Sequence, residues 1–285
     1  MIILKNNEFI EREHAMIDME DRGFQFGDGV YEVIRIYDGS FFLLDDHLTR
    51  LQYSLDETKI QVNLKDEQIK EKLLELAKKN DIQDGGIYIQ ISRGVAPRNH
   101  LFPADAKATI FAYPLPLKKP VDKQINGVKA ILDQDIRWYR CDIKSLNLMG
   151  NILSKQKAKD EGAFEAILYR DENHVTEGSA TNMFIVKDQK LITHPENNYI
   201  LHGITRRYIL YLATQLGIDF EERVYSVDEL LNADEVFLTS TTSEVIPIVE
   251  IDDKKIQDGK PGPISKKLLD HYDENLKLDA LSKMD

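Results

Sequence analysis

Lys144 is the residue whose surroundings in the sequence point most clearly to chemistry. It follows an apolar and aromatic stretch that includes Trp138 and Ile143, and Leu146 lies just beyond it, so we expect its amine to enter the protein interior. Burial favours the neutral form of an amine, because water stabilises the charged form. A neutral amine can form a Schiff base with a carbonyl group. Most lysines are surface residues, so this hypothesis depends on the partners of Lys144.

A second candidate lies 33 residues after Lys144, where Glu177 stands among small polar residues just before an apolar run. Gly178 is typical of a polar turn, which is the simpler interpretation. The functional interpretation is a carboxylate that pairs with a buried cation. The pyridinium nitrogen of pyridoxal phosphate is such a cation, since an acidic partner keeps it protonated and able to draw electrons into the ring.

Two segments and one arginine could bind a phosphate group. Residues 201–206 enter a predicted helix at Ile204 and Thr205, where backbone N–H groups and the helix dipole favour an anion. Residues 239–243 are five consecutive hydroxyl residues directly after a predicted strand, and Arg50 could add a positive charge. Helix capping, a solvated turn and a surface arginine are the alternative explanations.

A basic loop at residues 93–100 could bind a carboxylate. Arg93, Arg98 and His100 place three potential cations in eight residues of an acidic chain. A solvated loop explains the same pattern equally well. The amine, the acidic partner, the phosphate-binding segments and this loop are together the parts that pyridoxal-phosphate chemistry on amino acids requires.

The composition excludes several classes of function. The chain has 37 basic and 49 acidic residues and a net charge of −12, which argues against nucleic acids and anionic membranes as partners. Cys141 is the single cysteine, so no disulfide can form within the chain, and seven scattered histidines make a metal site unexpected. The N-terminal residues do not resemble a signal peptide, and no apolar run is long enough to span a membrane. We therefore expect a cytoplasmic, metal-free protein.

The spacing of apolar residues predicts the helices and strands that must position these residues. In the first part we expect a hairpin within residues 34–44, helices at 45–58 and 66–80, and strands at 87–91 and 109–113. The second part is predicted to contain strands at 128–134, 164–169, 182–187, 190–193, 234–240 and 245–250, and helices at 150–161, 204–216 and 263–276.

Three prolines in residues 114–120 mark the best domain boundary. We expect an N-terminal domain at 1–117, an interdomain linker at 114–122 and a C-terminal cofactor-binding domain at 123–285. The order of elements predicts an α/β (α+β) fold of two domains, a small N-terminal α/β domain and a larger one with a barrel-like sheet and helices.

The chain resembles the fold-type IV pyridoxal-phosphate enzymes, and within them the class IV group of D-amino acid (D-alanine) aminotransferases. The resemblance extends from about Asp18 to Pro261. It is carried by residues 20–32, 137–138 with 140–147, 176–179, 203–206 and 239–244. Two positions depart from the pattern: Arg35 stands where a lysine is expected, and Ala180-Thr181 replaces a run of serines.

The resemblance implies a role for each matching residue. Lys144 would be the catalytic Schiff-base lysine and proton carrier, and Glu177 would hold the pyridine nitrogen. The phosphate would be bound by Arg50, Ile204, Thr205, Ser240 and Thr241, and Leu201 would pack against the cofactor ring. The α-carboxylate of the substrate would be held by Tyr31, Arg98 and His100.

The resemblance also implies an activity and an assembly. The cofactor would be pyridoxal 5′-phosphate, and D-alanine with 2-oxoglutarate would give pyruvate and D-glutamate, a supply of D-amino acids for cell-wall precursors. The enzyme would be a homodimer whose active site takes the loop with Arg98 and His100 from the neighbouring subunit. Branched-chain L-aminotransferases and aminodeoxychorismate lyases share this fold and are the alternatives, together with a binding protein that has no catalytic activity.

Overall fold

The computed structural model describes residues 1–281, which form two compact units. Unit 1 comprises Met1–Lys118 and Ile143–Leu148, and unit 2 comprises Lys119–Asp142 and the chain from Met149 onward. The chain thus passes from unit 1 to unit 2 inside the segment expected as a linker. The last four residues of the domain expected at 123–285 lie outside the described part of the chain.

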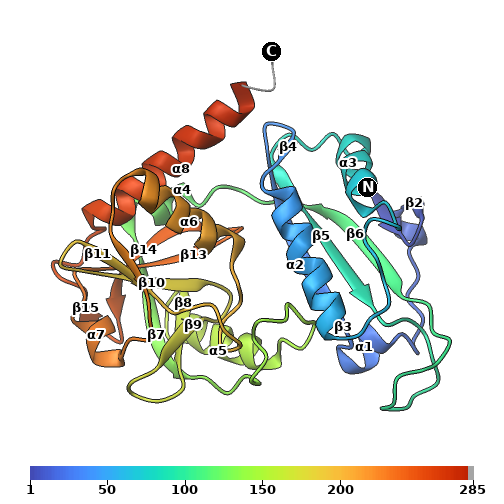
Figure 1. The fold of residues 1–285 in the computed structure, drawn as a ribbon, viewed down its shortest axis with the longest axis horizontal. Helices are drawn as coiled ribbons and strands as arrows, with labels where there is room; N and C mark the ends of the chain where they lie inside the picture. The colour runs from blue at the N-terminus through green and yellow to red at the C-terminus, as the bar shows by residue number, and fades with distance from the viewer. Residues whose placement is uncertain (282–285) are drawn as a thin grey trace. The chain divides into compact units, whose positions relative to one another are not determined.

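Unit 1 is built on a six-stranded sheet with the order β2-β1-β6-β5-β3-β4. Its strands are β1 (Ile2–Lys5), β2 (Glu8–Glu11), β3 (Gly29–Tyr37), β4 (Ser40–Phe41), β5 (Gly85–Ser92) and β6 (Thr109–Leu115). Its helices are the 3-10 turn η1 (Arg12–His14), α1 (Arg22–Phe26), α2 (Leu44–Glu57) and α3 (Ile69–Lys79). Helix α2 runs along one face of this sheet (Figure 1).

The side chains of β3 alternate between two faces of the sheet. One face lies in the core of unit 1, and the other carries aromatic residues. Val30, Ile34 and Ile36 are buried in the cluster that contains Leu51 and Leu55 of α2. Burial of each such side chain contributes about 1.5–3 kcal/mol. Because successive side chains of a strand point to opposite faces, the odd-numbered residues of β3 lie on the other face of the sheet.

The segment Ile143–Leu148 belongs to unit 1, although the sequence analysis placed it in the second domain. Tyr31 N donates to Lys144 O at 3.0 Å, and Leu146 N donates to Gly29 O at 2.9 Å. The side chain of Ile143 joins the core beneath the sheet. These contacts link residues that are far apart in the sequence, so no local sequence pattern predicts them.

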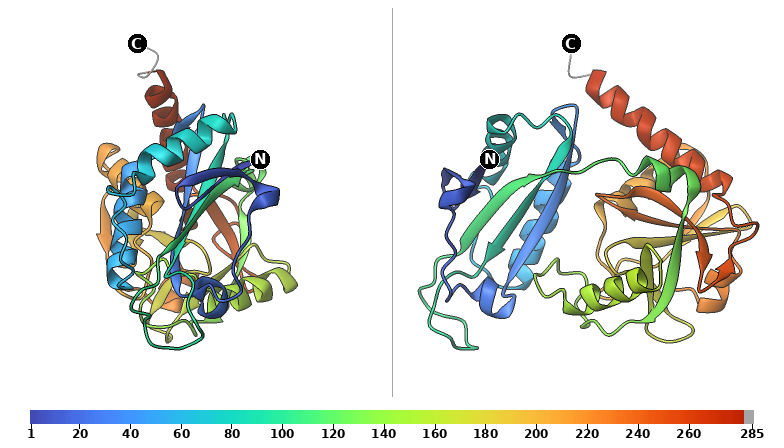
Figure 2. Two further views of the ribbon diagram at one scale, coloured as in Figure 1. Left: turned by 90° about the vertical axis from the view of Figure 1, so that its right-hand side faces the viewer. Right: turned by 180° about the vertical axis from the view of Figure 1, so that it is seen from behind.

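Unit 2 contains a mixed nine-stranded sheet with the order β12-β11-β10-β13-β14-β7-β8-β9, and β15 pairs with β14. The strands are β7 (Val128–Gln134), β8 (Glu165–Tyr169), β9 (Val175–Gly178), β10 (Asn182–Lys187), β11 (Lys190–Thr193), β12 (Phe220–Glu222), β13 (Glu235–Ser240), β14 (Glu244–Ile251) and β15 (Lys254–Lys255). The sheet curls into a half-barrel (Figure 2). This confirms the expected fold class.

The helices of unit 2 are α4 (Val121–Asn126), α5 (Met149–Asp160), α6 (Ile204–Gln215), α7 (Val227–Leu231) and α8 (Pro263–Leu281). Helices α6 and α8 pack against each other, and α5 packs against β8 (Figure 2). None of the helices in residues 1–281 is both long enough and apolar enough to cross a membrane.

The expected linker differs from the structure at both of its ends. Pro114 lies within β6, opposite Ile87 of β5, and α4 begins at Val121. Proline cannot donate a hydrogen bond to a neighbouring strand. It is tolerated here because β1 pairs with β6 only at Phe111 and Ala112, which leaves Pro114 with one paired neighbour.

Candidate active site

Lys144 lies beside the aromatic face of unit 1. Its Nζ is 4.3 Å from the centre of the Tyr31 ring, and its backbone N donates to Ser54 Oγ at 3.2 Å. The side chain is half-buried rather than enclosed, because the segment that carries it lies along the end of the sheet. The amine is thus held at a fixed place next to a tyrosine, where it remains accessible to a ligand.

Tyr31 belongs to a row of three tyrosines on this face. Its ring stacks on Tyr88 at 5.7 Å, and Tyr88 packs on Tyr113 at 5.0 Å. Tyr88 donates a hydrogen bond to Gln90, and burial raises the pKa of Tyr88. The row fixes the orientation of the Tyr31 ring beside Lys144.

Arg50 is a buried residue of α2 and not the surface arginine that its sequence context suggested. Its Nε and Nη2 donate to the two carboxylate oxygens of Glu32 at 2.7 and 2.9 Å. His47 lies 2.8 Å from the same carboxylate and must donate from Nδ1, since an ionised carboxylate only accepts. Burial alone would raise the pKa of Glu32, but the charges of Arg50 and His47 lower it. The guanidinium of Arg50 is therefore a fixed positive group.

The loop at residues 93–100 has two exposed basic side chains rather than three. Arg93 is buried, binds Asp28 through Nε and Nη2 and donates to two backbone carbonyls, so it serves the fold. Arg98 and His100 are exposed, and both contact the ring of Phe26, at 4.5 and 5.6 Å. Phe26 holds this part of the loop in place and leaves both polar groups accessible.

Glu177 is a buried carboxylate of unit 2 with three hydrogen-bond donors around it. Arg137 Nη1 donates to Oε1 at 2.6 Å, and Asn182 Nδ2 and the backbone N of Leu201 donate to Oε2 at 2.9 and 3.0 Å. Burial raises the pKa of Glu177 to about 7, and the ion pair with Arg137 opposes this shift. The carboxylate is therefore held rigidly where it can respond to a nearby cation.

Arg137 and Asp135 are functional neighbours of Glu177 that the sequence analysis missed. Arg137 binds Asp135 through Nε and Nη2, each at 2.9 Å, with its other edge toward Glu177. The two residues stand two positions apart just after β7, and this spacing is the only local signal for the pair. Asp135 orients the guanidinium that holds Glu177.

The turn after Glu177 is anchored by a second buried carboxylate, Glu165 of β8. Ser179 Oγ donates to Glu165 Oε1, and Thr181 Oγ1 donates to Oε2 at 3.1 Å. Ala180 is exposed. The departure Ala180-Thr181 thus keeps the hydroxyl group that reaches Glu165 and changes a position that faces solvent.

Helix α6 begins beside Glu177 with no side-chain cap. Its N-cap residue is Gly203, where a Cβ atom would lie 1.9 Å from Oδ1 of Asn182. Glycine is therefore required for Asn182 to reach both Glu177 and the carbonyl of Leu201. The start of α6, with Ile204 and Thr205 buried, is an N-terminus suited to an anion.

Ser240 and Thr241 lie in the turn that joins β13 to β14. Ser240 Oγ accepts a hydrogen bond from Ser243 N at 3.0 Å and lies 3.3 Å from Thr242 Oγ1. Ser240 and Thr241 are half-buried, and Thr242 is exposed. The turn places these hydroxyl groups together at the end of β13.

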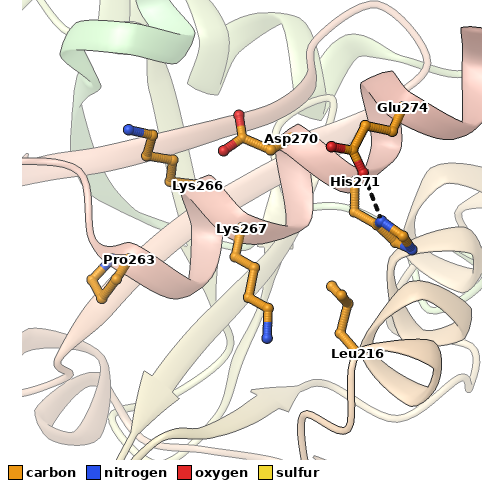
Figure 3. Close-up of a pocket in the computed structure, with 7 residues that line it drawn as sticks. All are labelled: Leu216, Pro263, Lys266, Lys267, Asp270, His271 and Glu274. Atoms are coloured by element: carbon orange, nitrogen blue, oxygen red, sulfur yellow. Dashed lines mark hydrogen bonds and ion pairs between the residues drawn. The ribbon is translucent and has the colours of Figure 1, made fainter.

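A separate surface pocket in unit 2 contains none of the predicted site residues. Figure 3 shows its lining, from Leu216 after α6 and from α8: Pro263, Lys266, Lys267, Asp270, His271 and Glu274. Within it His271 lies 3.3 Å from Glu274. Charges of both signs line the pocket, so it has no preference for a phosphate.

The donor set of each unit fits pyridoxal phosphate. Among residues 1–281 no three histidine, cysteine or acidic side chains lie close enough together to hold a metal ion. Unit 1 supplies an accessible amine at Lys144 and the fixed cation of Arg50. Unit 2 supplies the buried carboxylate of Glu177 and the uncapped start of α6. An aldehyde, a phosphate and a ring nitrogen are the groups that such residues bind.

Comparison with known proteins identifies close relatives. The family model described as amino-transferase class IV matches residues 29–251. The chain is similar to the D-alanine aminotransferase of Bacillus licheniformis, with 50% identity over 93% of this chain and 94% of that protein. It is 46% identical to the D-alanine aminotransferase of Staphylococcus haemolyticus, over 94% of this chain and 95% of that protein.

Solved structures of branched-chain amino acid aminotransferases are similar in fold. The Escherichia coli enzyme matches with a TM-score of 0.90 and 27% identity, over 94% of this chain and 92% of that one. The Thermobaculum terrenum enzyme in its PLP-form (holo-form) matches with a TM-score of 0.84 and 30% identity, over 96% of this chain and 92% of that one.

Proposed function

The chain belongs to the class IV aminotransferase family, and we propose that it transfers amino groups between D-amino acids and 2-oxo acids with pyridoxal 5′-phosphate as the cofactor. The first substrates to test are D-alanine and 2-oxoglutarate, with pyruvate and D-glutamate as products. The D configuration is supported by identity of 44–50% to D-alanine aminotransferases, against 26–30% to the branched-chain enzymes.

The buried environment of the Glu177 carboxylate is the observation that supports pyridoxal phosphate as the cofactor. A buried carboxylate with a pKa of about 7 gains most from a nearby positive charge, which lowers its pKa and ionises it. We propose that this charge is the protonated ring nitrogen. When bound, pyridoxal phosphate supplies an aldehyde for the amine of Lys144 and a ring that accepts electrons from the substrate.

The phosphate is proposed to be bound by residues from three places in the sequence. The backbone N–H groups of Ile204 and Thr205 would donate to it at the start of α6. The hydroxyl groups of Ser240 and Thr241 and the guanidinium of Arg50 would add further donors. Leu201, whose backbone already binds Glu177, would pack against the cofactor ring.

Lys144 is proposed to carry the proton during catalysis. Its Nζ would remove the proton from Cα of the substrate and later deliver it to C4′ of the cofactor, so the same amine acts as base and then as acid. Tyr31, whose ring centre lies 4.3 Å from that amine, would hold the substrate α-carboxylate beside it. Arg137 would keep Glu177 oriented toward the ring nitrogen throughout.

We propose that the active enzyme is a homodimer in which the loop with Arg98 and His100 binds the substrate carboxylate of the neighbouring subunit. Both side chains are exposed in the single chain. They are followed by Leu101 and Phe102, which are 76% and 58% exposed. Two adjacent exposed apolar side chains next to two basic residues are unusual for a free surface and suit a contact with a second copy.

The cytoplasm is the proposed location of this activity. Cys141 is the only cysteine of the chain, and its side chain is buried. A single buried thiol suits a reducing compartment, where disulfides are rare.

The test of the proposed function is the loss of the cofactor bond in Lys144→Ala. The wild-type protein with added pyridoxal phosphate should absorb near the visible edge and convert D-alanine to pyruvate. Lys144→Ala should lose both properties while it keeps the far-ultraviolet circular dichroism of the wild type. The exposed lysine variant Lys65→Ala should keep both. Full activity of Lys144→Ala would disprove the assignment.

A further inference from the structure

Arg35 is a buried arginine in β3 that has no counter-ion among residues 1–281. Its side chain is 4% exposed, and its Nη1 is buried without a hydrogen-bond partner. No carboxylate within the described residues forms an ion pair with it. Its guanidinium lies 4.8 Å from the centre of the Tyr37 ring, a contact that attracts the charge but supplies no hydrogen-bond acceptor.

Other buried arginines of unit 1 are neutralised. Arg22 and Arg93 share one aspartate at 2.7 and 2.9 Å, and Arg50 binds Glu32 at 2.7 Å. A buried charge without a partner is unfavourable, because it loses its hydration and no ion pair replaces the lost interactions. Arg35 is therefore an exception among the buried arginines of unit 1, and its guanidinium requires an anion as a partner.

The strand places Arg35 on the face of the sheet that carries the catalytic amine. Tyr31 and Arg35 are four residues apart in β3 and hence on the same face, with Cα atoms about 13 Å apart. Tyr31 is in contact with the amine of Lys144. Both side chains share this face of the sheet, and the guanidinium of Arg35 lies against the ring of Tyr37, farther along β3.

We propose that Arg35 binds the distal carboxylate of a dicarboxylic substrate, such as D-glutamate or 2-oxoglutarate. This inference rests on the proposed function and deepens it, because it explains how one site accepts both D-alanine and a five-carbon diacid. D-alanine has no distal charge and makes no use of Arg35. A diacid supplies the missing acceptor for the guanidinium, in a charge-assisted pair.

The decisive comparison uses D-glutamate and D-glutamine, which have the same shape and differ in the distal charge. Single-turnover rates of the cofactor-loaded enzyme with each amino acid are measured by cofactor absorbance. In Arg35→Met the preference for D-glutamate over D-glutamine should fall by about 10- to 100-fold. The rate with D-alanine should stay within about threefold. Arg35→Lys keeps the charge and should lose less of the preference than Arg35→Met.

A binding measurement tests the same idea without turnover. Glutarate and valerate have the same chain length, and glutarate alone carries a second carboxylate. At equal concentration, glutarate should raise the melting temperature of the cofactor-loaded wild type more than valerate. In Arg35→Met this difference should disappear.

Four results would overturn the inference. If Arg35→Met retains the D-glutamate preference, or if glutarate and valerate protect the wild type equally, Arg35 does not bind a distal carboxylate. If Arg35→Met loses the cofactor itself, the anion that Arg35 binds is the phosphate. If the wild type does not react with D-alanine at all, it is the proposed function that fails, and the inference fails with it.

Discussion

Arg137 Nη1 lies 2.6 Å from Oε1 of Glu177, and both side chains are buried in unit 2. Asp135 holds the other edge of the same guanidinium. The carboxylate is thus held in place by groups of the protein itself, which suits the proposed contact with a ring nitrogen at a set position.

The first prediction concerns the stability of the cofactor-free protein as the pH changes. Burial raises the pKa of Glu177 from 4.5 to about 7, so the folded protein holds a proton that the unfolded chain has released. This contribution to stability is complete below about pH 4.5 and is lost as the pH rises through 7. Between pH 5 and pH 8 the wild type should lose about 2–3 kcal/mol from this group.

Glu177→Gln provides the comparison, because glutamine does not titrate. The free energy of unfolding of both proteins is measured in urea at pH 5 and pH 8. Comparing the two proteins cancels the contribution of the other titratable groups. The wild type should lose more stability than Glu177→Gln over this interval. Equal losses in the two proteins would contradict the raised pKa of Glu177.

The second prediction concerns the hydroxyl group of Thr181. Thr181→Val keeps the volume of the side chain but removes the hydrogen bond to the buried carboxylate of Glu165, which should cost about 1–3 kcal/mol in urea unfolding. Thr181→Ser keeps the hydroxyl group and should cost less. If Thr181→Val and Thr181→Ser are equally stable, the hydrogen bond does not hold this turn.

Much of the fold could be predicted because its signals are local. Ile69, Leu73, Leu76 and Ala77 recur on one helical face, and all four are buried in α3. The strand predicted at 182–187 is found at Asn182–Lys187. Short elements such as α1 and β12 were missed, since five or three residues give too little periodicity to detect.

The partners of the candidate site residues could not be predicted, because they come from distant parts of the sequence. Glu177 meets Arg137 across 40 positions, and Arg50 meets Glu32 across 18. Arg93 has the same charge as Arg98, and only the position of Asp28 shows that Arg93 serves the fold. Residue type indicated the chemistry, whereas the pairing depends on how the chain folds.

The third prediction concerns the shared active site of the proposed dimer. Lys144→Ala lacks the amine, and Arg98→Met lacks the cation of the loop, so each homodimer should have little activity with D-alanine. A mixed dimer has one site with the intact Lys144 of one subunit and the intact Arg98 of the other. Unfolding and refolding the two variants together should therefore restore activity. No recovery, with mixed dimers shown by native mass spectrometry, would place Arg98 in the same subunit as Lys144 or outside the site.

The most direct test of the central claim is the formation of pyruvate from D-alanine. The purified protein with pyridoxal phosphate and 2-oxoglutarate is incubated with D-alanine, and in parallel with L-alanine and L-leucine, and the 2-oxo acid products are measured. Pyruvate and an equal amount of D-glutamate should form from D-alanine, with little product from either L-amino acid. Rapid conversion of L-leucine with no reaction of D-alanine would contradict this claim.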